Sequence, residues 1–200
     1  MKRALCFALA ACLVLTGACA GQPLPAPAAP DAVYAAGTAA GDVYENRYFA
    51  LRFTLPEGWS FQDVAALAAL LGSETAEPGL PEVSTYYEFY AGDGGDGTAM
   101  LTVEDLSRHQ GGRLVTVRAF ADALAAQYAA VESVPYVIGE LQTAELAGRT
   151  AMVLPVSAPD SGYFQRSWVF RTNDYMATLT FCSADESALD ELERAVTKLD

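Results

Sequence analysis

Hydrophobic residues occupy every second position along several short stretches of this chain, which is the pattern of β-strands with one buried face. The first of these stretches runs from Phe49 to Leu55. Pro56-Glu57-Gly58 follows it, and proline and glycine in succession end a strand. We therefore predict a strand over residues 49–55.

Further runs rich in aromatic and β-branched residues predict the remaining strands. They are residues 85–90, 98–106, 136–143, 150–156, 163–172 and 175–182. The glycine-rich segment 91–97 joins the first two runs, which indicates a hairpin with a flexible tip. Residues typical of turns separate the last four runs, so we expect them to form an antiparallel meander.

Three other stretches have apolar residues at every third or fourth position, the spacing of an amphipathic helix. We predict helices over residues 62–71 and 117–130, the second with Thr116 as its N-cap. Ser183 and Glu186 form a capping box before a last helix. Its apolar stripe is Leu189, Leu192, Val196 and Leu199. Together these elements predict an α+β fold, an antiparallel sheet covered by helices.

The N-terminal residues have the pattern of a secretory signal peptide. Lys2 and Arg3 are basic, and an apolar run then extends from Ala4 to Gly17. At about 14 to 17 residues this run is shorter than the roughly 20 that cross a bilayer as a helix. We therefore expect export from the cytoplasm rather than a permanent membrane span.

Leu15-Thr16-Gly17-Ala18 resembles the lipobox of bacterial lipoproteins, where a signal peptidase cuts before a cysteine that carries a lipid. The resemblance implies that Cys19 is the mature N-terminus and anchors the chain to membrane lipid, on the outer face of the cell membrane or on the outer membrane. Two alternatives remain open. Cleavage after Ala18 or Ala20 would give a freely secreted protein, and Leu9-Ala10-Ala11-Cys12 forms a second lipobox after a shorter apolar run.

The composition then changes twice along the chain. Residues 19–42 are rich in proline and alanine and nearly uncharged, which is typical of a tether that extends by about 3.1 Å per residue where proline dominates. Residues 43–200 contain the predicted strands and helices. The sequence thus predicts a signal peptide over 1–18, an anchor and tether over 19–42, and one domain over 43–200.

The charge balance excludes a class of partners. The chain has 12 Lys and Arg against 25 Asp and Glu, a formal net charge of −13. Removal of Lys2 and Arg3 with the leader would make the charge about −15. Because nucleic-acid binding needs a basic surface that neutralises phosphates, we expect no nucleic-acid partner.

The segment from Val43 to Phe61, with a strand closed by Leu-Pro-Glu-Gly-Trp, resembles the start of PsbP-like domains. This is the family of the photosystem II extrinsic subunit and of many bacterial lipoproteins. The later order of helix, four-stranded meander and C-terminal helix is similar as well. The resemblance implies an α/β/α sandwich and a role in binding or assembly rather than catalysis. It transfers no functional residues.

Few residues could carry out a reaction. His109 is the only histidine, and it lies in a predicted loop without the flanking motif of a hydrolase. Glu104 and Asp105, or Glu140 and Glu145, could serve as an acid–base pair, but no spacing rule selects either pair. We therefore predict a binding module, not an enzyme. The alternative is a small hydrolase or ligand-binding lipoprotein with a cleft near His109.

Metal and thiol chemistry have weak candidates. Asp93 and Asp96 within the glycine-rich tip are candidate calcium ligands, but two carboxylates fall short of the six to eight oxygens that calcium takes. Cys182 has no cysteine left to pair with once the leader is removed and Cys19 is acylated, so we expect a partly buried structural thiol. We predict no cofactor, and an unidentified protein or envelope component as the partner.

Overall fold

The computed structural model describes residues 34–64, 67 and 84–199. The predicted signal peptide, Cys19 and residues 20–33 of the tether lie outside this part of the chain. So do most of the predicted helix over 62–71 and most of the loop that follows it.

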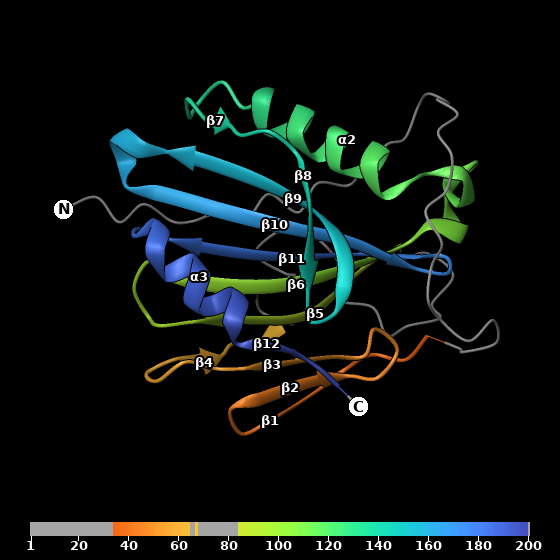
Figure 1. The fold of residues 1–200 in the computed structure, drawn as a ribbon, viewed down its shortest axis with the longest axis horizontal. Helices are drawn as coiled ribbons and strands as arrows, with labels where there is room; N and C mark the ends of the chain where they lie inside the picture. The colour runs from red at the N-terminus through yellow and green to blue at the C-terminus, as the bar shows by residue number, and fades with distance from the viewer. Residues whose placement is uncertain (1–33, 65–66, 68–83, 200) are drawn as a thin grey trace.

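Two antiparallel sheets form the described fold (Figure 1). The large sheet consists, in spatial order, of β4 (Ser60–Phe61), β5 (Thr85–Gly92), β6 (Thr98–Asp105), β11 (Tyr175–Ser183), β10 (Tyr163–Thr172), β9 (Arg149–Ala158) and β7 (Val137–Ile138), and β8 (Gln142–Leu146) also pairs with β9. The small sheet consists of β1 (Thr38–Ala40), β2 (Val43–Asn46), β3 (Leu51–Thr54) and β12 (Val196–Lys198). Two helices, α2 (Val117–Ala129) and α3 (Glu186–Arg194), lie against the large sheet.

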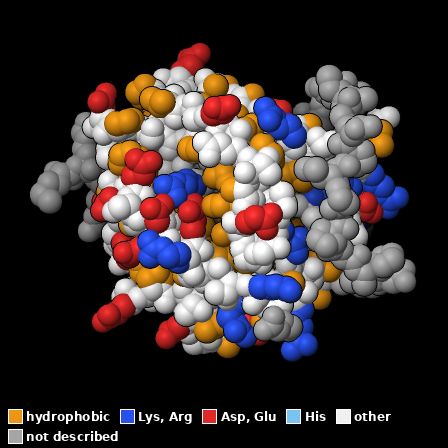
Figure 2. Space-filling view, viewed as in Figure 1, with side chains coloured by type: hydrophobic (Ala, Val, Ile, Leu, Met, Phe, Trp, Pro, Cys, Tyr) orange, Lys and Arg blue, Asp and Glu red, His pale blue; other side chains and the backbone are white. Residues whose placement is uncertain are grey.

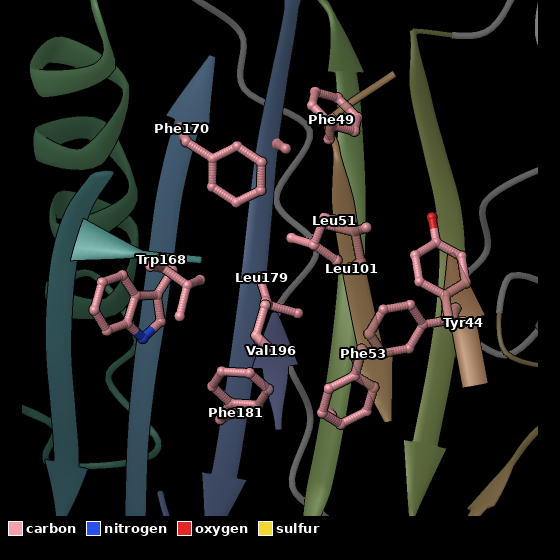
Figure 3. Close-up of a cluster of buried hydrophobic side chains, with 14 of the residues drawn as sticks. Tyr44, Phe49, Leu51, Phe53, Leu101, Trp168, Phe170, Leu179, Phe181 and Val196 are labelled. Atoms are coloured by element: carbon pink, nitrogen blue, oxygen red, sulfur yellow. The ribbon is translucent and has the colours of Figure 1, made fainter. Parts of the chain in front are cut away.

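The main hydrophobic core lies between the two sheets (Figure 3). Phe53 of β3 and Val196 of β12 are partners in the small sheet, and both are buried. Leu179 and Phe181 of β11 reach the same core from the large sheet. Because each fully buried Leu or Phe side chain stabilises a fold by about 1.5–3 kcal/mol, this layer supplies much of the cohesion between the sheets.

The opposite face of the large sheet packs against α2. Phe120 and Leu124 of α2 contact a second buried cluster that includes Leu154 of β9 and Val169 of β10. Met176 of β11 belongs to this cluster, while Leu179 belongs to the first. Side chains of β11 therefore enter both clusters, and the strand is buried on both faces.

The predicted α+β class and the antiparallel pairing are confirmed. The α/β/α layering implied by the family resemblance is met only in part in the described residues, because the small sheet and α3 together cover the face opposite α2. A second sheet therefore occupies much of the place of an outer helical layer.

One predicted strand is interrupted. Residues 136–143 do not form a single strand, because β7 and β8 pair with β9 in registers that differ by one residue. Gly139 still follows the register of β7, since its N–H donates to Pro155 O at 2.8 Å, and the register changes between Gly139 and Gln142. A side chain at Gly139 would approach the Pro155 ring to 3.0 Å, so the close contact favours glycine.

The last predicted helix is shorter than expected and has a different cap. Asp185 is the N-cap and accepts from Ser187 N at 2.9 Å, whereas Ser183 belongs to β11. The helix ends at Arg194, and Val196 lies in β12. Leu189, Leu192 and Val196 are all buried in one core, so their spacing resembles that of a single helical stripe. Val196 reaches this core from a strand.

Candidate functional site at one end of the large sheet

His109 lies beside Glu104 at the end of β6. The strand ends at Asp105, and the short 3-10 turn Leu106–Arg108 folds the chain back so that His109 Nε2 contacts Glu104 Oε1. Thr85 of β5, the cross-strand partner of Glu104, donates its hydroxyl to Glu104 Oε2. The Glu104 side chain is 9% exposed and that of His109 is 25% exposed, so only the imidazole is accessible to solvent.

Two glycines make this reversal possible. Gly111 has a φ of +74°, a conformation that other residues rarely adopt. A side chain at Gly112 would meet Leu106 O at 2.1 Å, so the return of the chain over the turn leaves room for glycine only. The loop that the sequence predicts around His109 is therefore a tightly packed double turn.

Asp105 points to the other face of the sheet and stabilises the same turn. Its carboxylate accepts from Ser107 N at 3.0 Å and from Ser107 Oγ at 2.5 Å, and Arg108 Nε donates to it at 3.3 Å. Tyr175 lies nearby on β11. Burial and the charge of Asp105 raise the pKa of Tyr175 to about 12, against the opposing effect of Arg108.

The chemistry of this group of residues is limited by its hydrogen bonds. A carboxylate orients an imidazole, as in the acid–base half of a hydrolase site. The two neighbouring hydroxyls, of Thr85 and Ser107, both donate to carboxylates. Neither hydroxyl is therefore aligned with the imidazole as a nucleophile. The His109–Glu104 pair offers one polar, partly exposed ring for hydrogen bonding.

The two candidate calcium ligands lie at the tip of the β5–β6 hairpin, where the sequence places them. Asp93 Oδ1 accepts from Gly95 N at 2.7 Å and from Gly97 N at 3.1 Å, so its carboxylate closes the turn. Across the part of the chain that the structure describes, no three His, Cys, Asp or Glu side chains are placed to hold a metal ion. Asp93 therefore acts as a turn residue in this structure.

Cys182 lies on β11 and is buried, at 1% exposure. Its Sγ lies 3.6 Å from Tyr163 Oη and 3.5 Å from Gln165 Oε1. Gln165 Nε2 donates in turn to Tyr128 Oη of α2 at 2.6 Å. Burial raises the pKa of the Tyr163 and Tyr128 hydroxyls, so both stay protonated.

A second carboxylate cluster was not anticipated from the sequence. A β-bulge between Tyr87 and Phe89 turns Glu88 toward the small sheet. Glu88 there accepts from Gly37 N at 2.7 Å and from Tyr44 Oη at 2.7 Å. Tyr34 Oη also donates to it. The available signal was one acidic residue within the aromatic run of β5, but its partners are 44 to 54 positions away along the chain.

The segments that bear on localisation are not described. Cys19 and residues 20–33 of the predicted tether lie before Tyr34, where the described fold begins. Residues 34–42, which the sequence assigns to the tether, are part of this fold: Tyr34 is buried and Thr38–Ala40 form β1. Among the described helices, none has the length and apolar character needed to span a bilayer.

Comparisons with known proteins give structural similarity only. No family model and no curated protein matches the sequence. A solution structure of cyanobacterial PsbP (CyanoP) from Synechocystis sp. PCC 6803 is 12% identical, with 86% of this chain and 98% of that chain covered and a TM-score of 0.49. A crystal structure of LpqN, involved in cell envelope biogenesis of Mycobacterium tuberculosis, is 13% identical, with 74% and 82% covered and a TM-score of 0.39. The chain is similar in structure to a PsbP protein, at low sequence identity.

Proposed function

We propose that this protein is a lipid-anchored extracytoplasmic module that binds another protein or an envelope component and catalyses no reaction. The observation that carries the proposal is that the potentially reactive side chains are either bonded to other residues of the fold or buried in it. The only histidine in the sequence contacts Glu104, and the hydroxyls beside it donate to carboxylates. Cys182 is buried.

The sequence supports the anchor. A lipobox-like segment precedes Cys19, and 14 residues separate this cysteine from Tyr34. A proline-rich linker of this length extends to roughly 45 Å, at about 3.1 Å per residue. The domain can therefore move over the membrane surface while it remains attached to it.

The anchor is tested by substituting Cys19→Ala and measuring acyl labelling and membrane retention. We expect loss of both, because no other part of the proposal holds the chain at a membrane. Cys12→Ala is the matched control, since Cys12 belongs to the second lipobox-like sequence. Retention and labelling that persist in Cys19→Ala but disappear in Cys12→Ala would assign the lipid to Cys12, and membrane retention without acyl labelling in the wild type would refute lipid anchoring.

The binding role is tested by crosslinking in cells followed by mass spectrometry of the copurifying proteins and envelope material. We expect a saturable partner that the tether fused to an unrelated domain does not capture. A capture profile identical to that of the unrelated domain would reduce the protein to a structural spacer.

The His109–Glu104 contact favours a second candidate, a hydrolase or ligand-binding lipoprotein that acts at this imidazole. Catalysis at this position requires His109, whereas binding elsewhere on the domain does not. His109→Ala should therefore leave partner capture unchanged. An esterase or ligand-induced shift present in the wild type and absent from His109→Ala would support the second candidate instead.

A further inference from the structure

Three basic residues without a carboxylate partner lie at one corner of the domain. Among the described residues, six arginines have a carboxylate within 4.0 Å: Arg52, Arg108, Arg113, Arg118, Arg166 and Arg171. No such ion pair is found, within that same part of the chain, for Arg47, Arg149, Arg194 or Lys198. Arg194 lies in the last turn of α3, whereas the other three lie near one another. We call Arg47, Arg149 and Lys198 the basic corner.

Backbone contacts hold the basic corner together. Arg149 follows the β8–β9 turn, and its guanidinium donates to Phe49 O at 2.5 Å and to Thr172 Oγ1 at 2.8 Å. Phe49 lies in the β2–β3 turn, which starts at Arg47. A carbon placed at Gly148 would lie 3.9 Å from Lys198 Cδ, so the Lys198 side chain extends along the β8–β9 turn.

The position of Arg149 makes its missing carboxylate notable. Its guanidinium stacks over the Phe170 ring, 5.2 Å from the centroid, and burial lowers its pKa. A guanidinium has five N–H donors, of which two are used here. A partly buried cation in a chain with a net charge of −13 would be expected to attract a carboxylate, so the remaining donors suit an anion from outside the chain.

The tether joins the domain beside this corner. Tyr34, the first described residue, packs its ring 5.3 Å from Tyr48 and 6.2 Å from Phe49, in the same turn that carries Arg47. Figure 2 shows acidic side chains gathered on the left, over α3 and the strands next to it, with basic side chains among them, and further basic side chains toward the lower right, over the small sheet. The first described residue therefore lies beside the turn that carries Arg47.

We propose that the basic corner docks onto the anionic lipid headgroups of the membrane that holds the anchor, which fixes the orientation of the domain. The inference rests on the proposed function, because an acylated Cys19 brings the corner to the headgroups. The overall negative charge does not prevent docking, because charges farther than about 8 Å from the surface are screened at physiological salt. Each basic residue at an anionic surface favours the docked orientation by about fivefold.

The test uses the processed protein purified from membranes, with the mass of its N-terminal peptide determined first. The protein is reconstituted into vesicles of phosphatidylcholine alone, or of phosphatidylcholine and phosphatidylglycerol in equal parts, and amide hydrogen exchange is measured. We expect slower exchange at residues 47–51 and 147–149 on the anionic vesicles only. The double variant Arg47→Gln/Lys198→Gln should lower the equilibrium constant for docking about 25-fold, while Arg118→Gln, on α2, should not lower it.

The outcomes separate the two proposals. An unmodified Cys19 refutes the anchor, and docking is then measured with the Cys19→Ala chain by cosedimentation with the same vesicles at low salt. Equal exchange on both vesicle types, together with equal cosedimentation, overturns docking even if Cys19 is acylated. Protection of the corner that requires added envelope proteins would show that the corner binds an acidic protein, and would also overturn it.

Discussion

Tyr44 of the small sheet donates its hydroxyl to Glu88 Oε2 of the large sheet at 2.7 Å. The bond crosses the interface between the two sheets, beside the contact of Phe53 with Phe89, whose rings stack at 5.3 Å. Gly37 N donates to the same oxygen of Glu88 at 2.7 Å. The Glu88 carboxylate therefore connects both the first described residues and the small sheet to the large sheet.

We predict that Glu88→Gln destabilises the domain by about 1–3 kcal/mol, because the amide places N–H groups opposite donors and leaves them unpaired. The free energy of unfolding in urea measures the effect. Glu45→Gln is the control, since Glu45 forms a half-exposed ion pair with Arg52 at 2.6 Å, a type of pair worth about 0–1 kcal/mol. Equal losses in the two variants would contradict a special role for Glu88.

The tyrosines around Glu88 predict instability in alkali. Burial, together with the charge of Glu88, raises the pKa of Tyr44 above its ordinary value of 10. The folded state therefore keeps Tyr44 protonated while the unfolded chain ionises, so stability is intact below about pH 10 and falls as pH rises beyond it. Thermal unfolding between about pH 9 and pH 11 should show a shallower decline in Tyr44→Phe than in the wild type. A parallel decline in the two proteins would be inconsistent with this origin.

The contact of Glu104 with Thr85 predicts energetic coupling across β5 and β6. In a double-mutant cycle of Thr85→Val and Glu104→Gln, we expect a coupling energy of about 0.5–3 kcal/mol in urea unfolding, because the two side chains share a hydrogen bond at a buried carboxylate. The exposed pair Arg118–Asp122, at 3.4 Å, is the comparison and should couple by no more than about 0.5 kcal/mol. Coupling no larger than that of the comparison pair would show that the Glu104 contact is not stabilising.

The cap of α3 predicts a response to acid. Hydrogen bonds from the backbone and side chain of Ser187 lower the pKa of Asp185 below its ordinary value of 3.8. Its contribution to stability is therefore present at neutral pH and is lost as pH falls through the lowered pKa. Asp185→Asn should unfold at a lower temperature than the wild type near neutrality, and the difference should shrink in acid. Ser183→Ala should have a smaller effect, and a larger effect would restore Ser183 as the cap.

Local patterns were sufficient for the elements whose partners are close in sequence. The hairpin of β10 and β11 follows from two alternating runs joined at Asn173-Asp174, and Thr116 caps α2 as predicted, with its Oγ1 accepting from Ala119 N at 3.1 Å. Loop placement also identified His109 as partly accessible.

Features that depend on distant contacts could not be predicted in this way. The orientation of Glu88 requires a bulge in β5, and its donors come from the first described residues. The end of α3 at Arg194 depends on the pairing of Val196 with Phe53, which no local periodicity reveals. The environment of Cys182 depends in the same way on Tyr163 and Gln165, which lie on the neighbouring strand.

Because β12 pairs with β3, the small sheet joins residues from nearly opposite ends of the domain. Neither Leu51 nor Phe53 has its full set of strand partners until residues 196–198 are present, so this part of the core forms late and from contacts that are distant in sequence.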